Sequence, residues 1–413
     1  MTGEPTDLVP VDEHVDRILD TVAPLGDFPQ PLMEALGLAA AEDVVAPIPL
    51  PSFDNSAMDG YAVTLADVES ASAERPATLP VVGEIGAGRT SHLALSPGTA
   101  AKIMTGAPVP TGAEAVVPYE WTDRGVAQVR IDQAPTPGAN IRRAGEDVSV
   151  GDLLIEHGTI LGPRHLGLLA AVGRATVATR PRPRVVIIST GSELRDPGTA
   201  LSHDSIYDAN SWLLAASARR AGAIAYRVGP VSDEPSEFTE TLSDQLVRAD
   251  LVVTSGGVSE GDYDVVKEAL ASLGSMWFGR VAMQPGKPQG FGTVGDDRVP
   301  IFTLPGNPVS SYISFETFVL PALRRMMGKL PYRRPTRRAI LTHAVSSPAG
   351  KRQFVRAGLD LAGVGAHVSP VGGHGSHLLG DLASANALIV VPEETTSLAA
   401  GDQVQVLALD EEF

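Results

Sequence analysis

The chain has 413 residues, of which 43% are hydrophobic and 20% charged, and it carries a formal net charge of −17. This length predicts two to four domains, and the acidic charge argues against nucleic-acid and membrane partners because its field repels polyanions. The chain has no cysteine, no apolar run near the roughly 20 residues of a membrane span and no signal-peptide pattern in its first residues. We therefore expect a cytoplasmic protein without disulfides or thiolate chemistry.

The first part of the chain is expected to be helical and then rich in β-strands. Apolar residues recur at helical spacing within residues 1–26, which predicts an amphipathic helix that packs with the α/β domain. PLMEALGLAAAEDVV extends this helical pattern to about residue 42, and Pro163 suits the first turn of a later helix. We assign residues 27–48 and 147–178 to a helical linking domain. Residues 49–146 alternate short apolar runs with Gly/Pro turns, which predicts a β-rich domain.

Residues 179–328 have the alternation of an α/β domain. RVVIIST, IAYRVGPV, DLVVTS, MWFGRVAM and VPIFTL are predicted strands, and the segments between most of them are predicted helices. One such helix begins near Asp208 or Asn210 and ends near Gly222. Continuous apolar strands of this kind indicate a parallel sheet with helices on both faces. After residue 328 the alternation ends, and residues 329–413 are predicted to form a small C-terminal β-domain.

Chemically distinctive residues follow the predicted strands of the α/β domain. Ligands of an open parallel sheet bind beyond the carboxyl ends of its strands, so these residues are expected to share one site. Gly256 and Gly257 would let backbone N–H groups approach an anion, and Lys287 would add a positive charge. The acidic residues Glu193, Asp233 and Asp264 would repel that anion unless a divalent cation lay between them.

Simpler interpretations remain open for several of these residues. A Gly-Gly pair after a strand is often only a tight turn, and a single acid at a helix start is more often a cap than a metal ligand. We interpret Trp277 and Met283 as core residues. His374 and His377 have metal-pair spacing but are more typical of solvated loop histidines.

Together, these motifs resemble the MoeA family, the molybdopterin molybdenumtransferases, which includes the E domains of gephyrin and plant Cnx proteins. The resemblance covers nearly the whole chain and is weakest in the first ten residues and the C-terminal domain. The matching strings occur in the order of the family: PLPSFDNSAMDGYAV, KIMTGAPVPTGAEAVVP, RRAGEDV, STGSEL, SGGVSEGDYD, PGKPQGFG and LPGNPVSS.

The resemblance implies an enzyme that inserts molybdate into adenylylated molybdopterin, with Mg²⁺-dependent release of AMP. It also implies an elongated homodimer, a MogA-like α/β domain facing the partner's β-rich domain, and exchange with a MogA-type adenylyltransferase and molybdoenzyme maturation partners. The implied magnesium ligands are Glu193 and Asp264. The implied catalytic residues are Asp59, Thr105, Asp147, Glu193, Asp233, Asp264 and Lys287. The implied cofactor-binding residues are Thr190, Gly191, Ser192, Ser255, Gly256, Gly257, Val258, Pro288, Pro305, Gly306, Asn307, Pro308, Arg352 and Ser376, with Arg356 near the molybdate position.

The chain departs from the family pattern at Gln284. Many relatives have a basic residue there, so its loss should weaken oxyanion affinity unless Arg280 or Arg352 reaches in. Two alternative functions also remain: a MogA-type adenylyltransferase, which usually consists of the α/β domain alone, and a non-catalytic dimeric scaffold like the related region of gephyrin.

Overall fold

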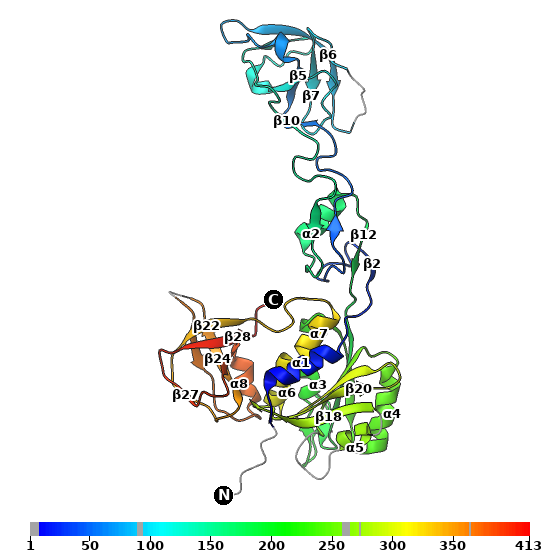
Figure 1. Cartoon of the computed structure of the whole chain (residues 1–413), viewed down its shortest axis with the longest axis vertical. Coiled ribbons are helices and arrows are strands. Elements are labelled where there is room, and N and C mark those ends of the chain that lie inside the picture. Colours follow the sequence, from blue (N-terminus) through cyan, green and yellow to red (C-terminus); the bar gives the residue numbers. More distant parts are fainter. Residues whose placement is uncertain (1–7, 89–93, 258–264, 272–273, 363–364) are drawn as a thin grey trace.

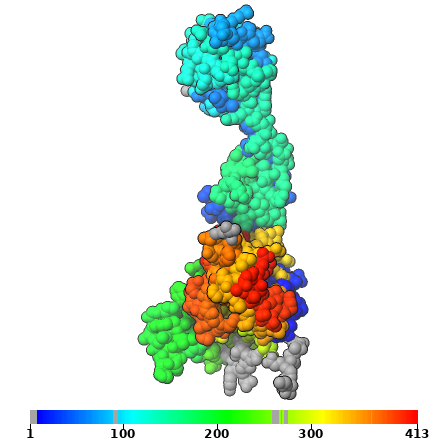
Figure 2. Space-filling model, turned by 90° about the vertical axis from the view of Figure 1, so that its left-hand side faces the viewer, coloured from blue at the N-terminus to red at the C-terminus, as the bar shows by residue number. Residues whose placement is uncertain are grey.

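The computed structural model describes residues 8–88, 94–257, 265–271, 274–362 and 365–413. The molecule is elongated, as predicted (Figure 1). The β-rich domain lies at one end of the long axis and the linking domain in the middle. The α/β and C-terminal β-domains lie together at the other end. Figure 2 shows a narrow neck between the β-rich and linking domains. No helix among the described residues is long and apolar enough to cross a membrane.

A seven-stranded sheet with the order β1-β18-β20-β21-β17-β13-β16 forms the centre of the α/β domain. Most neighbours are parallel, as predicted, but β20 runs antiparallel to both β18 and β21. The sequence pattern does not predict β20, whose segment PQGFGTV is not among the predicted strands. The strands are β1 (Leu8–Val9), β13 (Arg184–Thr190), β16 (Ile224–Val231), β17 (Leu251–Ser255), β18 (Gly274–Val281), β20 (Pro288–Val294) and β21 (Val299–Leu304).

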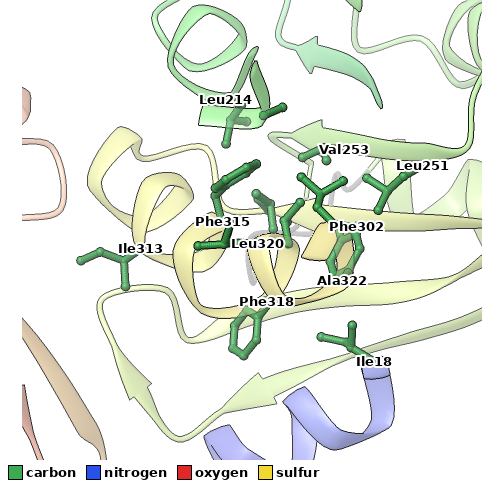
Figure 3. Packing of buried hydrophobic residues seen from close by; sticks show 14 of the residues in the cluster. Ile18, Leu214, Leu251, Val253, Phe302, Ile313, Phe315, Phe318, Leu320 and Ala322 are labelled. Atoms are coloured by element: carbon green, nitrogen blue, oxygen red, sulfur yellow. The ribbon is translucent and has the colours of Figure 1, made fainter. Parts of the chain in front are cut away.

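Helices cover both faces of this sheet because the central strands are apolar on both sides. In β13, Val185 and Ile187 belong to one buried cluster, while Val186 and Ile188 belong to the other. The first cluster lies under α1, α3, α6 and α7, where Figure 3 shows Ile18 and Phe318 facing the sheet. The second lies under α4 and α5. The helices are α1 (Val11–Thr21), α3 (Asn210–Arg220), α4 (Pro235–Leu246), α5 (Val265–Ala271), α6 (Pro308–Ser314), the π-helical turn Phe315–Val319 and α7 (Leu320–Met326).

The linking domain is less helical than predicted. The predicted continuation of the helix to residue 42 is wrong. This part of the chain forms a short strand, β2 (Phe28–Pro31), followed by turns. Gly37, in the middle of the predicted helix, has a φ of +76°, and this left-handed conformation is incompatible with a continuous α-helix. β2 pairs with β12 (Thr176–Thr179), β3 (Val44–Val45) pairs with β11 (Leu153–Ile155), and α2 (Pro163–Ala171) begins at the expected proline.

The β-rich domain is built on a five-stranded sheet with the order β8-β5-β7-β6-β9. Two apolar clusters pack on it, one around Tyr61 and Val117 and the other around Ala62 and Ile103. Its elements are β4 (Asn55–Ser56), β5 (Gly60–Val63), the 3-10 turn Leu65–Asp67, β6 (Ala77–Ile85), β7 (Ala100–Ile103), β8 (Ala115–Pro118), the 3-10 turn Tyr119–Trp121, β9 (Gln128–Ile131) and β10 (Ile141–Arg142).

The C-terminal domain is a small closed β-barrel, since the pairings β24-β25-β22-β28-β26 return to β24. A short strand that follows β18, β19 (Met283–Gln284), joins β24 in parallel and places Gln284 opposite Gln353. This pairing fixes the barrel beside the α/β domain. The elements are β22 (Thr336–Leu341), β23 (Val345–Ser346), β24 (Arg352–Asp360), β25 (His367–Pro370), α8 (Leu379–Ser384), β26 (Ala387–Val391), β27 (Ser397–Leu398) and β28 (Gln403–Ala408).

Candidate active site

A cavity of about 570 Å³ lies at the carboxyl ends of β13, β17 and β21. This is the edge at which an open parallel sheet binds ligands. The structure thus brings together at one cavity most of the residues that sequence analysis assigned to the α/β loops. Those that line it are Thr190, Gly191, Glu193, Asp233, Ser255, Gly256, Gly257, Pro288, Pro305, Gly306, Asn307 and Pro308.

Gly256 allows two loops to approach closely at the cavity wall. Its φ is +102°, and a Cβ added there would lie 2.7 Å from the carbonyl oxygen of Thr190. Its N–H group donates to Leu304 O at 3.1 Å, so this N–H is used within the sheet rather than by a ligand. In the described part of the chain, the N–H groups of Gly306 and Asn307 have no acceptor. These two groups are therefore better placed for an anion.

Sequence analysis missed the contribution of the start of α3. The Asn210 side chain donates from Nδ2 to Ser255 Oγ at 2.7 Å and to Gly306 O at 2.6 Å, and so joins the two glycine loops. Asp208 is the cap: its carboxylate accepts from the N–H of Ser211 at 3.0 Å and from the Ser211 hydroxyl. In the sequence, the only sign of this part of the cavity wall is that DAN, residues 208–210, follows a strand. The other lining residues that were missed are Ser189, Leu194, Ile206, Tyr207, Ala209, His377 and Leu379.

The cavity is acidic. Glu193, Asp208 and Asp233 line it, and no lysine or arginine is among its described lining residues. Asp208 is held by α3, whereas Asp233 accepts from the N–H of Ser192 at 3.0 Å and so joins the loops after β13 and β16. No group of three or more metal-ligating side chains occurs among the described residues. Even so, Glu193 and Asp233 fit Mg²⁺, because this ion commonly takes one or two carboxylates plus substrate phosphate oxygens.

A second, smaller hollow lies on the other side of the start of α6. Gln284, Gln353, Arg356 and His374 are among its lining residues. Arg356 is only 4% exposed, and its guanidinium donates to Gly375 O at 3.0 Å. Its Nε and the Oε1 of Gln353 are buried without a hydrogen-bond partner among the described residues. The hollow, of about 10 Å³, has room for about one water, which would pair with both groups.

The segment 373–379 runs between the two hollows. His374 lines the smaller one and His377 the larger one. Both histidines are exposed, as expected, yet both border a candidate site, which sequence analysis did not predict. Ser376 lies between the hollows, with its carbonyl oxygen accepting from Val309 N at 3.1 Å.

The remaining predicted residues lie in different places. Lys287 directly precedes the lining residue Pro288, and its carbonyl oxygen accepts from Val281 N at 2.8 Å. Arg352 is not brought to either hollow: it pairs with Asp12 at 2.8 Å and with Glu393 at 3.0 Å. Val258 and Asp264 lie outside the described residues, so their predicted roles remain predictions. Met283 is buried in the core of the α/β domain, and Trp277 packs against that core, as expected.

Asp59 and Thr105 lie in the β-rich domain, at the opposite end of the molecule from both hollows (Figure 1). The carboxylate of Asp59 accepts from the N–H and from the hydroxyl of Thr105, both at 2.7 Å. These hydrogen bonds lower the pKa of Asp59, so the group stays ionised in solvent. Asp147 is exposed at the neck, and its N–H donates to Leu50 O.

Three family models match successive parts of the chain. They are the MoeA N-terminal region (domain I and II) over residues 9–173, the probable molybdopterin binding domain over residues 186–325, and the MoeA C-terminal region (domain IV) over residues 338–409.

Full-length relatives and a solved structure agree with these matches. The chain is 49% identical to molybdopterin molybdenumtransferase 2 of Mycobacterium tuberculosis, over 96% of this chain and 98% of that protein. It is 35% identical to molybdopterin molybdenumtransferase of Bacillus subtilis, over 98% and 95% of the two chains. The crystal structure of the molybdopterin biosynthesis MoeA protein from Pyrococcus horikosii matches with a TM-score of 0.86 and 32% identity, over 98% and 100% of the two chains.

Proposed function

The chain belongs to the MoeA family of molybdopterin molybdenumtransferases, and we propose that it inserts molybdate into adenylylated molybdopterin with Mg²⁺-dependent release of AMP. It is a transferase of molybdenum cofactor biosynthesis. The observation that supports the proposed reaction is the pair of adjacent hollows. One has the size and acidic lining for a pyrophosphate with its metal, and the other has the buried cationic group for an oxyanion.

The larger hollow would hold the pyrophosphate that joins the pterin to AMP. The N–H groups of Gly306 and Asn307 would donate to its oxygens, while Asn210 keeps both glycine loops in position. Glu193 and Asp233 would hold Mg²⁺, together with Asp264. Bound Mg²⁺ would neutralise charge on the pyrophosphate and polarise it. The chain's own contribution to the barrier is then positioning and fixed electrostatics.

Molybdate would lie at the edge of the smaller hollow, beside the reacting end of the pterin, because the hollow itself, of about 10 Å³, has room for about one water. Arg356 would donate from Nε to a water in this hollow and through it to the oxyanion, and Lys287, one residue from the wall of the larger hollow, would add positive charge. Gln284 would donate from its amide in place of a charged group, so molybdate affinity rests on Arg356. Water or a molybdate oxygen would attack the phosphorus on the pterin side, forming one P–O bond as the bridging P–O bond breaks and AMP leaves. The two dithiolene thiols would then bind molybdenum through two Mo–S bonds, and their protons would leave with one molybdate oxygen as water.

We also infer that the active enzyme is a homodimer. The exposed pair Asp59 and Thr105 cannot reach the hollows of its own chain, because the neck and the linking domain separate them (Figure 1). A second copy packed in the opposite direction would bring this pair over the partner's α/β domain. The active site would then combine two chains, which a two-fold dimer permits at both sites at once.

The substrate implies the cellular setting. A MogA-type adenylyltransferase would supply the adenylylated pterin, and molybdoenzyme maturation partners would receive the product, all in the cytoplasm. The adenylyltransferase and scaffold alternatives are not favoured, since full-length relatives carry the molybdenumtransferase name.

The test is AMP release from adenylylated molybdopterin, with and without molybdate and Mg²⁺. We expect release that requires both ions and falls at least about tenfold in Lys287→Ala, since removing a charged donor costs about 1.5 kcal/mol or more. Lys267→Ala is the matched control, because Lys267 is exposed on α5. AMP release that does not depend on molybdate, or an equal loss of AMP release in both variants, would contradict the proposal.

A further inference from the structure

A third cavity, of about 290 Å³, lies where the linking, α/β and C-terminal domains meet, and the proposed reaction does not use it. Gly37 of the linking domain lies on one side, and the ends of α3 and α7 with the C-terminal segment lie on the other. Figure 1 shows this C-terminal segment directly beneath the linking domain. Its lining includes six cationic side chains: Arg182, Arg219, Arg220, Arg324, Lys329 and Arg334.

The carboxylates around this cavity do not balance that charge. Glu316, Glu411 and Glu412 also line it, which leaves three more positive than negative groups in a chain whose net charge is −17. Glu316 is paired with Arg334 at 3.0 Å, and Glu411 is paired with Arg337, whose side chain does not line the cavity. Arg220 is likewise paired with Asp410, whose side chain does not line the cavity, so the two outside pairs cancel and the excess among the lining side chains stays at three.

The cations without an ion pair donate to backbone carbonyl groups. Arg182 donates to Gly222 O at 3.2 Å, and Arg324 donates to Pro331 O at 2.7 Å and Phe413 O at 2.6 Å. Neither forms an ion pair with a described side chain. Arg324 is only 4% exposed, and burial lowers its pKa to about 10. Guanidinium groups held by carbonyls keep their full charge and remain attractive to an anion.

Lys329 provides the second and independent observation. It is 8% exposed, lines the cavity and makes no hydrogen bond or ion pair through its ammonium with any described residue. A Cβ built on Gly222 would lie 3.2 Å from its Nζ, so the ammonium lies against the cavity wall. Burial, with the charges of Arg182 and Arg324, lowers the pKa of Lys329 to about 8. The nearby Glu412 acts in the opposite direction on this pKa, so the shift is a balance that an anion beside the ammonium would alter. A mostly buried lysine whose ammonium has no hydrogen-bond partner among the described residues favours such an anion.

We propose that this cavity is a second anion site, separate from the reaction centre, which binds a tetrahedral oxyanion such as phosphate between Lys329, Arg182 and Arg324. The volume suffices for one such ion with its remaining water. Arg182 also donates to Leu36 O of the linking domain at 3.5 Å, so an ion that holds Arg182 in place would favour one orientation of the linking domain on the α/β domain. Phosphate, sulfate and molybdate share the chemistry that the site recognises.

The first test uses the unaltered chain and needs no substitution. With a pKa of about 8, about half of the Lys329 amine is unprotonated near pH 8, so Lys329 can be reductively methylated and the modified peptide quantified by mass spectrometry. We expect inorganic phosphate to slow labelling of Lys329 several-fold and to leave Lys102 unchanged, since Lys102 is in the β-rich domain, paired with Glu84 at 3.5 Å. Parallel arms with sulfate and molybdate show which oxyanion is preferred. Labelling of Lys329 that no oxyanion slows would overturn the proposal.

The second test separates this site from the proposed molybdate site. Phosphate should raise the melting temperature of the unaltered chain by binding only the folded state. This rise should disappear in Lys329→Gln, persist in Lys351→Gln as the matched surface control, and persist in Arg356→Gln. Lys329→Gln removes an uncompensated buried charge, so the variant itself should fold at least as stably. A phosphate response unchanged in Lys329→Gln but absent in Arg356→Gln would assign the binding to the reaction centre instead.

Discussion

The backbone of Gly256 gives the most quantitative prediction for the candidate active site. In Gly256→Ala, the new methyl group would meet Thr190 O at 2.7 Å and Thr190 Oγ1 at 2.8 Å, at a φ of +102°. The unfavourable φ costs about 1–3 kcal/mol, and the forced contact with backbone costs about 1–3 kcal/mol more. We expect a loss of about 4 kcal/mol, which for a domain of this size lowers the melting temperature by about 10 °C.

Gly306→Ala is the matched control for this prediction. Gly306 has no positive φ, and the nearest heavy atom to its added Cβ would be Gly256 Cα at 3.8 Å, an ordinary contact. Its melting temperature should therefore stay within about 1 °C, since strain-free substitutions cost less than about 0.5 kcal/mol. Differential scanning calorimetry of both variants, with AMP and Mg²⁺ titrations, measures the contrast. If Gly256→Ala melted like the unaltered chain and kept its AMP affinity, the close approach of the two loops would be wrong.

Two further predictions concern a buried histidine and the oxyanion site. Burial lowers the pKa of His14 from 6.5 to about 3. Between these two pH values His14 is protonated in the unfolded chain but neutral in the folded chain. The free energy of unfolding therefore decreases as pH falls from 6.5 toward 3, by about 2 kcal/mol at pH 5. His14→Phe should flatten the melting temperature over this range, and an unchanged slope would show that His14 does not cause it. Arg356→Gln should raise the KM for molybdate by about tenfold or more, as loss of one charged hydrogen bond implies, whereas Arg352→Gln, which breaks the pair with Asp12, should not; equal effects would contradict the assignment.

Sequence reasoning was accurate where apolar pattern alone decides the structure. The strands 184–190 and 224–231 were predicted to the residue, because continuous apolar runs bounded by turns leave few alternatives. β20 was missed since its glycines resemble a loop. They are required by packing instead: a Cβ on Gly290 would lie 1.9 Å from Thr303 Oγ1, and one on Gly292 would lie 2.0 Å from Ser275 O. Such contacts arise only when the neighbouring strands are in place.

The candidate site was predictable in part for the same reason. The carboxyl edge of the sheet follows from strand order, so Glu193, Asp233 and Gly256 could be grouped without coordinates. Asn210 could not, because its amide bonds join loops that are 45 and 96 residues away in sequence. The separation of Asp59 from the hollows also depends on the extended shape, which residue patterns do not specify.

The most direct test of the proposed two-chain site mixes two inactive variants. Glu193→Gln alters the α/β wall, and Asp59→Asn alters the β-rich pair, so each homodimer should fail to release AMP from adenylylated molybdopterin with molybdate and Mg²⁺. In a randomly reassociated mixture, half of the dimers are hybrids with one unaltered site, and activity should recover to about a quarter of the unaltered enzyme. No recovery, with hybrid dimers demonstrated by mass, would contradict an active site shared between two chains.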